Sequence, residues 1–203
     1  MSVDTNLIKT PYKREKFNQQ QIEEIVKCTQ DPQYFIENFV WIQHPVKGRL
    51  KFDLFDFQRG LLDAYHNHRY SIALISRQMG KSTAAGAYLL WYAMYVPDQT
   101  ILIAAHKYSG AQEIMQRIRF AYELLPDHVR AGCTAYNKGS LEFDNGSRII
   151  AQATTENTGR GLSISLAYLD EFAFVRPSIA REFWTSLSPT LSTGGKCIIT
   201  STP

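Results

Sequence analysis

A glycine, a lysine and two hydroxyl residues stand together at Gly80-Lys81-Ser82-Thr83, soon after a run of apolar residues. They match the second half of a phosphate-binding loop, whose standard pattern is glycine, four residues, then Gly-Lys-Ser/Thr. The first glycine is missing, since position 75 is Ile75. The motif is therefore partial, and a Gly-Lys-Ser tripeptide that begins a helix by chance remains an alternative for the motif taken alone.

The context favours the phosphate loop, because an apolar strand is expected at 72–75 and a helix at 82–95. Backbone N–H groups and the helix N-terminus would then face the phosphates. Gly80 would let the backbone approach closely, Lys81 would reach the β- and γ-phosphates, and the Ser82 hydroxyl would coordinate Mg²⁺. The predicted ATP-binding loop comprises Ser76, Arg77, Gln78, Met79, Gly80, Lys81, Ser82 and Thr83.

An acidic pair, Asp170-Glu171, directly follows a second apolar run at 164–169. In ATPases with a phosphate loop, one carboxylate after a buried strand holds Mg²⁺ and the next polarises the attacking water. We predict that Asp170 is a metal ligand and Glu171 the catalytic base, with ATP and Mg²⁺ as cofactors. Many strands end in an acidic turn, so the pair carries this prediction only together with the loop.

The elements that must position these residues alternate between strands and helices. Further buried strands are expected at 100–105 and 196–200, and helices at 109–125 and 178–187. This alternation predicts an α/β fold with a mostly parallel sheet, helices on both faces and functional residues at the carboxyl ends of the strands. Asp144-Asn145-Gly146 predicts a β-hairpin within 139–153.

The N-terminal part shows helical signals without phosphate chemistry. We expect residues 1–17 to be poorly ordered, a helix at 18–29 begun by an Asn18/Gln21 capping box, and a second helix begun by Asp31-Pro32. We therefore predict two parts: 1–55 as a tail with a helical subdomain or lid, and 56–203 as the phosphate-loop core.

Composition is that of an ordinary globular domain, with 44% hydrophobic and 20% charged residues among 203. A formal net charge of +3 permits contact with nucleic acid but does not argue for it. The three cysteines have no CxxC spacing, so we interpret them as reduced thiols. No apolar run is long enough for a membrane span, and the N-terminus lacks a secretory signal.

Several stretches together resemble the large terminase subunit of tailed bacteriophages, most closely that of T-even-like myoviruses. The resemblance covers about residues 35–203 and includes the arginine inside a loop that lacks its first glycine. The other stretches are 57–59 before the loop, 104–107 after the next strand, the hairpin at 137–147, and 200–203. It implies a P-loop NTPase core of the RecA-like type with a hairpin insertion.

The resemblance also implies roles for single residues. Gln58 would recognise adenine, Arg77 would lie beside the γ-phosphate of its own subunit, and Arg160 would reach the ATP of a neighbouring subunit. Thr200, Ser201 and Thr202 would couple hydrolysis to DNA movement. Each role has a simpler alternative: a surface glutamine, an arginine paired with a carboxylate, a loop arginine and an ordinary strand end.

At the level of the whole protein, the resemblance implies an ATPase motor that packages double-stranded DNA into a procapsid in the host cytoplasm. Its partners would be the portal protein, the small terminase subunit and further copies in a ring, expected as a pentamer. Nuclease activity is not expected in this chain, and the ATPase core is expected to continue beyond Pro203. A helicase-type translocase and a nucleotide-binding assembly module without turnover are the alternatives.

Overall fold

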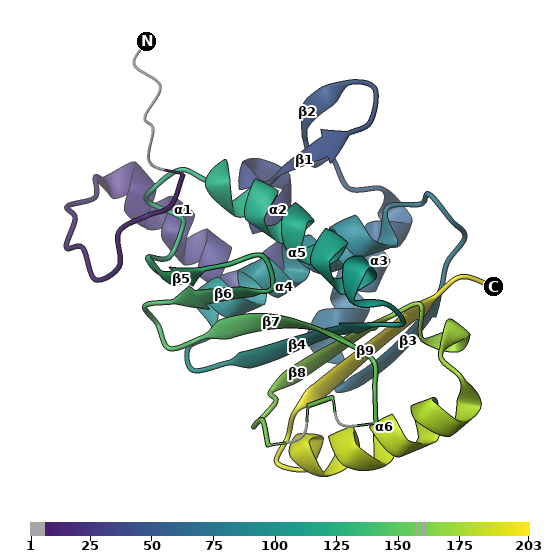
Figure 1. Ribbon diagram of the computed structural model, residues 1–203. Helices are drawn as coiled ribbons and strands as arrows, with labels where there is room; N and C mark the ends of the chain where they lie inside the picture. Colours follow the sequence, from purple (N-terminus) through teal and green to yellow (C-terminus); the bar gives the residue numbers. More distant parts are fainter. Residues whose placement is uncertain (1–6, 157, 160) are drawn as a thin grey trace.

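The computed structural model describes residues 7–156, 158–159 and 161–203. Its centre is a seven-stranded sheet (Figure 1). From one edge to the other, the strands are β3 (Tyr70–Leu74), β9 (Lys196–Ser201), β8 (Leu166–Asp170), β4 (Thr100–Ala105), β7 (Arg148–Ala153), β6 (Ser140–Phe143) and β5 (Cys133–Tyr136). The pairs among the first five strands are all parallel, and the β7–β6 and β6–β5 pairs are antiparallel, which confirms the mostly parallel sheet.

Helices cover both faces of the sheet, as predicted (Figure 1). They are α4 (Lys81–Tyr95) and α5 (Tyr108–Glu123) on one face and α6 (Pro177–Leu191) on the other. Strand β4 shows the division, because side chains alternate between the two faces of a strand. Ile101 and Ile103 join the hydrophobic cluster that contains α4 and α5. Leu102 and Ala104 join the cluster that contains α6.

The predicted hairpin is present, with its Asn-Gly turn between β6 and β7. Gly146 has a positive φ of 82°, a conformation that glycine adopts without a steric penalty. Asn145 Nδ2 donates to the carbonyl oxygens of Ala93 (2.9 Å) and Met94 (3.1 Å), so the turn also binds the end of α4. Strand β5 extends this hairpin by one strand that the sequence patterns did not predict.

Within the described residues before the sheet, 7–67, there are three helices and a separate two-stranded hairpin. They are α1 (Gln19–Gln30), α2 (Pro32–Phe39), β1 (Trp41–His44), β2 (Gly48–Lys51) and α3 (Asp56–Asn67). The Asn18/Gln21 capping box is confirmed. Phe35, Ile36 and Leu62 share one hydrophobic cluster with the buried side of α4. The sequence patterns predicted no strands in this hairpin, because its strands are short and partly exposed.

Residues 7–17 lie along the sheet edge formed by β5. Cys133 N–H donates to the Lys9 carbonyl oxygen (3.0 Å), and Tyr12 N–H donates to Asp144 Oδ2 (2.9 Å). The prediction of a poorly ordered tail is therefore wrong for this segment. These partners are more than a hundred residues away in the sequence, so no local pattern could have indicated them.

Some helix ends also differ from the predictions. Helix α5 begins at Tyr108 after Lys107, without a side-chain cap, and ends at Glu123, so it starts one residue before and ends two residues before the predicted range 109–125. Helix α6 continues to Leu191 and contains Pro189. No helix in the described part of the chain is long and apolar enough to cross a membrane.

Candidate nucleotide-binding site

The predicted phosphate loop connects the carboxyl end of β3 to the N-terminus of α4. Gly80 is the residue before the first helical turn and has a φ of 72°. A Cβ atom at Gly80 would lie 2.7 Å from Gln58 Nε2, closer than real Cβ contacts come. The conformation therefore favours glycine here, and any larger residue would also have to displace the Gln58 carboxamide. The first turn of α4 has N–H groups without helical partners, and such groups at a helix N-terminus favour anions.

Lys81 and Glu171 form an ion pair through Lys81 Nζ and Glu171 Oε1. The Lys81 side chain is only 8% exposed and that of Glu171 is 32% exposed. The other carboxylate oxygen, Oε2, accepts from the backbone N–H of Thr202 (3.0 Å) and from the Thr202 hydroxyl (3.1 Å). It lies 3.4 Å from the Ser201 hydroxyl. The free protein thus holds both oxygens of the predicted catalytic base.

These contacts set the ionisation of Glu171. Its partial burial acts to raise the pKa, but the Lys81 ammonium and the Thr202 donors outweigh burial. The pKa of Glu171 therefore lies below its ordinary value. The carboxylate is negatively charged at neutral pH, which is the state that a general base needs.

Asp170 lies beside the phosphate loop at the end of β8. Its Oδ1 atom accepts from Thr200 Oγ1 (3.0 Å) and from the Tyr168 hydroxyl (3.1 Å), and lies 3.5 Å from Ser82 Oγ. Carboxylate and hydroxyl oxygens are the ligands that Mg²⁺ prefers. Ser82 and Asp170 therefore fit a magnesium ion, and they come from the two motifs that the sequence suggested independently.

One cavity of about 1000 Å³ joins these groups. The predicted loop residues 76–83, both carboxylates and Thr202 line it, and residues 42–46 of the β1–β2 hairpin form a further wall. The size is that of a cavity for a nucleotide-sized ligand. The structure thus brings together the predicted phosphate-binding, metal-binding and catalytic residues, together with one residue of the predicted coupling segment.

Gln58 is buried, with 2% of its surface exposed. Its Nε2 donates to the Met79 carbonyl oxygen (3.1 Å), and its Oε1 accepts from the Phe55 N–H (3.1 Å). The side chain therefore holds the phosphate loop in place in the free protein. Recognition of adenine by Gln58 stays a prediction, and it would require the carboxamide to exchange at least one of these partners.

Of the two predicted arginines, the structure describes Arg77 but not Arg160. Arg77 is exposed and lines the cavity, and no ion-pair or hydrogen-bond partner for it exists among the described residues. The alternative in which Arg77 is held by a carboxylate has no support within that part of the chain. Arg160 lies outside the described residues, so its role in a neighbouring subunit's site stays a prediction.

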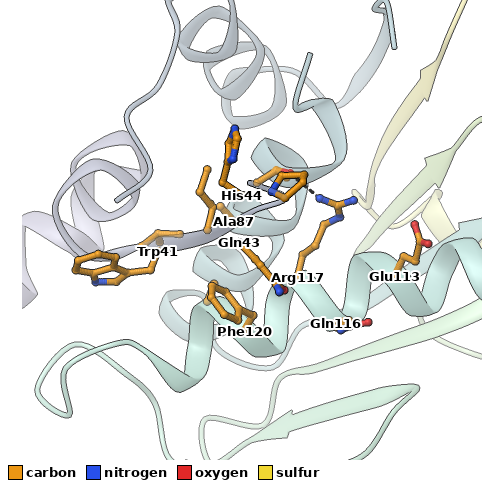
Figure 2. Close-up of a pocket in the computed structure, with 13 residues that line it drawn as sticks. Trp41, Gln43, His44, Ala87, Glu113, Gln116, Arg117 and Phe120 are labelled. Atoms are coloured by element: carbon orange, nitrogen blue, oxygen red, sulfur yellow. Dashed lines mark hydrogen bonds between the residues drawn. The ribbon is translucent and has the colours of Figure 1, made fainter. Parts of the chain in front are cut away.

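A second cavity of about 340 Å³ lies between β1 and α5 and adjoins the first (Figure 2). Trp41 and Phe120 line it, and Arg117 extends from α5 toward the hairpin. Arg117 lines both cavities, and its Nη1 donates to Thr83 Oγ1 (3.1 Å). Sequence reasoning missed Arg117, because only the packing of α5 against α4 brings it to the loop.

Comparison with known proteins gives the family. The family described as "Terminase large subunit, T4likevirus-type, N-terminal" matches residues 72–203, well over half of the chain. The chain belongs to this terminase family. The resemblance that the sequence motifs indicated is thereby confirmed.

Solved structures of terminases share the fold. The large terminase of bacteriophage HK97 aligns with a TM-score of 0.68 at 20% identity, over 86% of this chain and 37% of its own. The ATPase domain of the Thermus phage P74-26 large terminase gives 0.60 at 23% identity, over 75% and 66%. The large terminase of a thermophilic bacteriophage, in complex with ATP-gamma-S, gives 0.54 at 13% identity, over 73% and 38%. This terminase chain therefore spans between 37% and 66% of the length of these relatives.

Proposed function

We propose that this terminase chain is the ATPase part of a motor that packages viral DNA. It would bind ATP with Mg²⁺ at the phosphate loop, hydrolyse it, and use the energy to move double-stranded DNA into a procapsid. The observation that carries the proposal is the meeting of both motifs in one cavity, where Lys81 pairs with Glu171 and Ser82 lies beside Asp170. Complexes of the thermophilic bacteriophage's large terminase with ADP and with ATP-gamma-S support nucleotide binding at this fold.

The ion pair in the free protein suggests the first step. The phosphates of ATP would attract the Lys81 ammonium and free Glu171 Oε1, while Thr202 continues to hold Oε2. Oε1 would then accept a proton from the attacking water. The low pKa of Glu171 keeps the carboxylate ionised, which is the state needed for this step. Ser82 and Asp170 would hold Mg²⁺, which would supply positive charge at the β- and γ-phosphates.

Arginine would supply the remaining positive charge. Arg77 is unpaired within the described residues and lines the cavity, so its guanidinium is available to the γ-phosphate. We propose that Arg160 acts on the ATP of a neighbouring subunit in a ring. Its substitution by alanine should then reduce hydrolysis more in the assembled motor than in the monomer. Equal losses in both settings would argue against this role.

The contacts of residues 200–202 support a coupling role. Thr200 donates to Asp170, and Thr202 donates to Glu171 through both its backbone and its side chain. A change of charge or position at either carboxylate would therefore alter the hydrogen bonds of Thr200 and Thr202 at the end of β9. We expect this segment to transmit hydrolysis to the parts of the motor that grip DNA.

At the level of assembly, the proposal includes the portal protein, the small terminase subunit and a pentameric ring in the host cytoplasm. The N-terminal part would act as a lid, because its hairpin residues 42–46 form one wall of the nucleotide cavity. A hairpin that pairs only with itself can change its position without breaking the central sheet.

The test compares the parent chain with Lys81→Ala and Glu171→Gln. Calorimetry should show ATP binding by the parent and by Glu171→Gln, and a loss of at least tenfold in affinity for Lys81→Ala, on the order of the 1.4 kcal/mol that a charge-assisted phosphate contact supplies. Of the three proteins, only the parent should release phosphate. Turnover by Glu171→Gln at the parent rate would refute its assignment as base.

Two further outcomes would replace the proposal. ATP binding without phosphate release, even beside procapsid and portal, would favour an assembly module. Separation of a forked duplex would favour a helicase-type translocase.

A further inference from the structure

A fully buried tyrosine lies directly beneath the predicted metal ligand. Tyr168 precedes Asp170 by two residues on β8, so both side chains point to the same face of the sheet. The Tyr168 hydroxyl lies 3.1 Å from Asp170 Oδ1 and 2.9 Å from Thr200 Oγ1. Thr200 Oγ1 lies 3.0 Å from the same Oδ1 atom. Three oxygen atoms on two neighbouring strands thus form a closed triangle.

We propose that Tyr168 is a positioning residue that orients the Asp170 carboxylate for Mg²⁺. Oδ1 faces the hydroxyls of Tyr168 and Thr200 and lies 3.5 Å from Ser82 Oγ, whereas no donor within the described residues reaches Oδ2. The two buried hydroxyls therefore fix the carboxylate with Oδ1 beside the predicted ligand Ser82 and with Oδ2 free for the metal ion or its water ligands. This inference rests on the proposed role of Asp170 in an Mg²⁺-dependent ATPase and adds a residue that neither motif contains.

The count of hydroxyl protons explains why the triangle can fix the carboxylate. Tyr168 and Thr200 each carry one hydroxyl proton, and the three oxygens are close enough to share both. Either both protons point to Oδ1, or one hydroxyl donates to the other, which then donates to Oδ1. The carboxylate thus receives at least one charge-assisted hydrogen bond in every arrangement.

The backbone around the triangle is rigid. Strand β8 lies between β9 and β4, and Asp170 is paired in register with Thr200. Neither strand can shift without breaking ladder hydrogen bonds, so the orientation of the carboxylate depends on its side-chain partners alone. Without the Tyr168 hydroxyl, the Asp170 side chain would gain rotational freedom, and ordering it for the metal ion would cost affinity for Mg²⁺.

The same core offers a matched control. Tyr65 is also fully buried in the hydrophobic cluster that contains Tyr168. Its hydroxyl has no hydrogen-bond partner among the described residues. Tyr65→Phe therefore removes the same atom from the same core without removing a hydrogen bond to Asp170.

The experiment measures how Mg²⁺ changes the binding of ATP-gamma-S to the parent, Tyr168→Phe and Tyr65→Phe. Calorimetry without Mg²⁺ gives the contribution of the loop alone, and a Mg²⁺ titration at fixed nucleotide gives the half-maximal concentration. For Tyr168→Phe we expect that concentration to rise about three- to tenfold, the usual net worth of one hydrogen bond, because Thr200 still donates to the carboxylate. Binding without Mg²⁺ should stay unchanged, and Tyr65→Phe should match the parent.

Thr200→Val provides a second variant, because it removes the other hydroxyl of the triangle at nearly constant volume. It should raise the half-maximal Mg²⁺ concentration as well, and the double variant with Tyr168→Phe should raise it further than either change alone. Thr200→Ser keeps the hydroxyl and should restore the parent value. If Tyr168→Phe fails to fold, the comparison of Thr200→Val with Thr200→Ser still tests whether the triangle orients the carboxylate, and an unchanged Mg²⁺ dependence in Thr200→Val would overturn the inference.

The outcomes separate the inference from the proposed function. If the parent binds nucleotide in a Mg²⁺-dependent way and Tyr168→Phe has the same Mg²⁺ dependence, the positioning role is wrong and the function stands. Equal weakening with and without Mg²⁺ would show general damage to the core and would also overturn the role. Nucleotide binding by the parent that does not respond to Mg²⁺ would overturn both the metal site and the role of Tyr168.

Discussion

Replacement of Gly80 by alanine tests how the phosphate loop is held. Two penalties are expected, and the structure separates them. The first is the positive φ of 72°, which an L-residue adopts at a cost of about 1–2 kcal/mol. The second is the approach of the new Cβ to Gln58 Nε2, at 2.7 Å. The Gln58 side chain would have to leave the Met79 carbonyl oxygen that it now binds.

The second penalty follows from burial. Gln58 is 2% exposed, so a displaced carboxamide would lose its partner without gaining water, at about 1–3 kcal/mol. The total for Gly80→Ala is then about 2–5 kcal/mol. Gly48 is a matched control, because it has the same φ of 72° and no atom within 4 Å of a Cβ built there. Gly48→Ala should cost only the conformational part, about 1–2 kcal/mol.

Urea unfolding of the parent and both variants measures the two costs. A melting experiment should agree, with about 2–4 °C lost per kcal/mol for a chain of this size. The double variant Gly80→Ala/Gln58→Ala removes the clashing atom, so the two changes should be less costly together than the sum of the single changes. Equal destabilisation by Gly80→Ala and Gly48→Ala, or additivity in the double variant, would refute the contact between Gln58 and the loop.

Three further predictions follow from buried contacts. Glu171→Gln should destabilise the free protein by about 1 kcal/mol, because solvent screens a pair whose carboxylate is 32% exposed. That contribution is present above the ordinary carboxyl pKa of 4.5 and is lost as the pH falls through the lowered pKa, so the variant should show a flatter pH profile of unfolding between pH 7 and acid. Burial raises the pKa of Cys28 and Cys197 to about 12. A thiol reagent at pH 8 should therefore label these cysteines only after unfolding. Rapid labelling of the native protein would contradict their burial. Trp91 Nε1 donates to the Cys28 carbonyl oxygen (2.7 Å). This oxygen has no helical N–H partner, because the residue four positions later is Pro32. Trp91→Phe should therefore lower the free energy of unfolding in urea by about 1–3 kcal/mol.

The chemical centre of the site was predictable because it is encoded locally. Each motif is a strand followed by a short polar segment, and the carboxyl ends of parallel strands meet at one edge of the sheet. Lys81 and Glu171 are therefore in contact, even though β9 lies between their strands. The roles assigned to the individual residues remain predictions until they are measured.

The supporting residues could not be predicted in the same way. Alternation along β8 places Tyr168 on the same face as Asp170, but it does not show that Thr200 completes a triangle with them. The sequence likewise contains no signal for the contact between Arg117 and Thr83, which depends on how α5 packs against α4. Both cases need the relative positions of elements that are far apart in the chain.

The missing first glycine of the phosphate loop has a structural explanation. Ile75 is still part of the ladder, since its N–H donates to the Ser201 carbonyl oxygen (3.0 Å). The chain therefore turns only after position 75, and the left-handed residues Gln78 (φ 62°) and Gly80 provide the turn. A position with extended backbone can hold any residue, so glycine is not required there. The hydrogen bond of Ile75 connects the start of the phosphate loop to Ser201. The next residue, Thr202, donates to the predicted catalytic base Glu171. We expect movement of the loop on nucleotide binding to reach the coupling segment through this backbone contact as well as through Glu171.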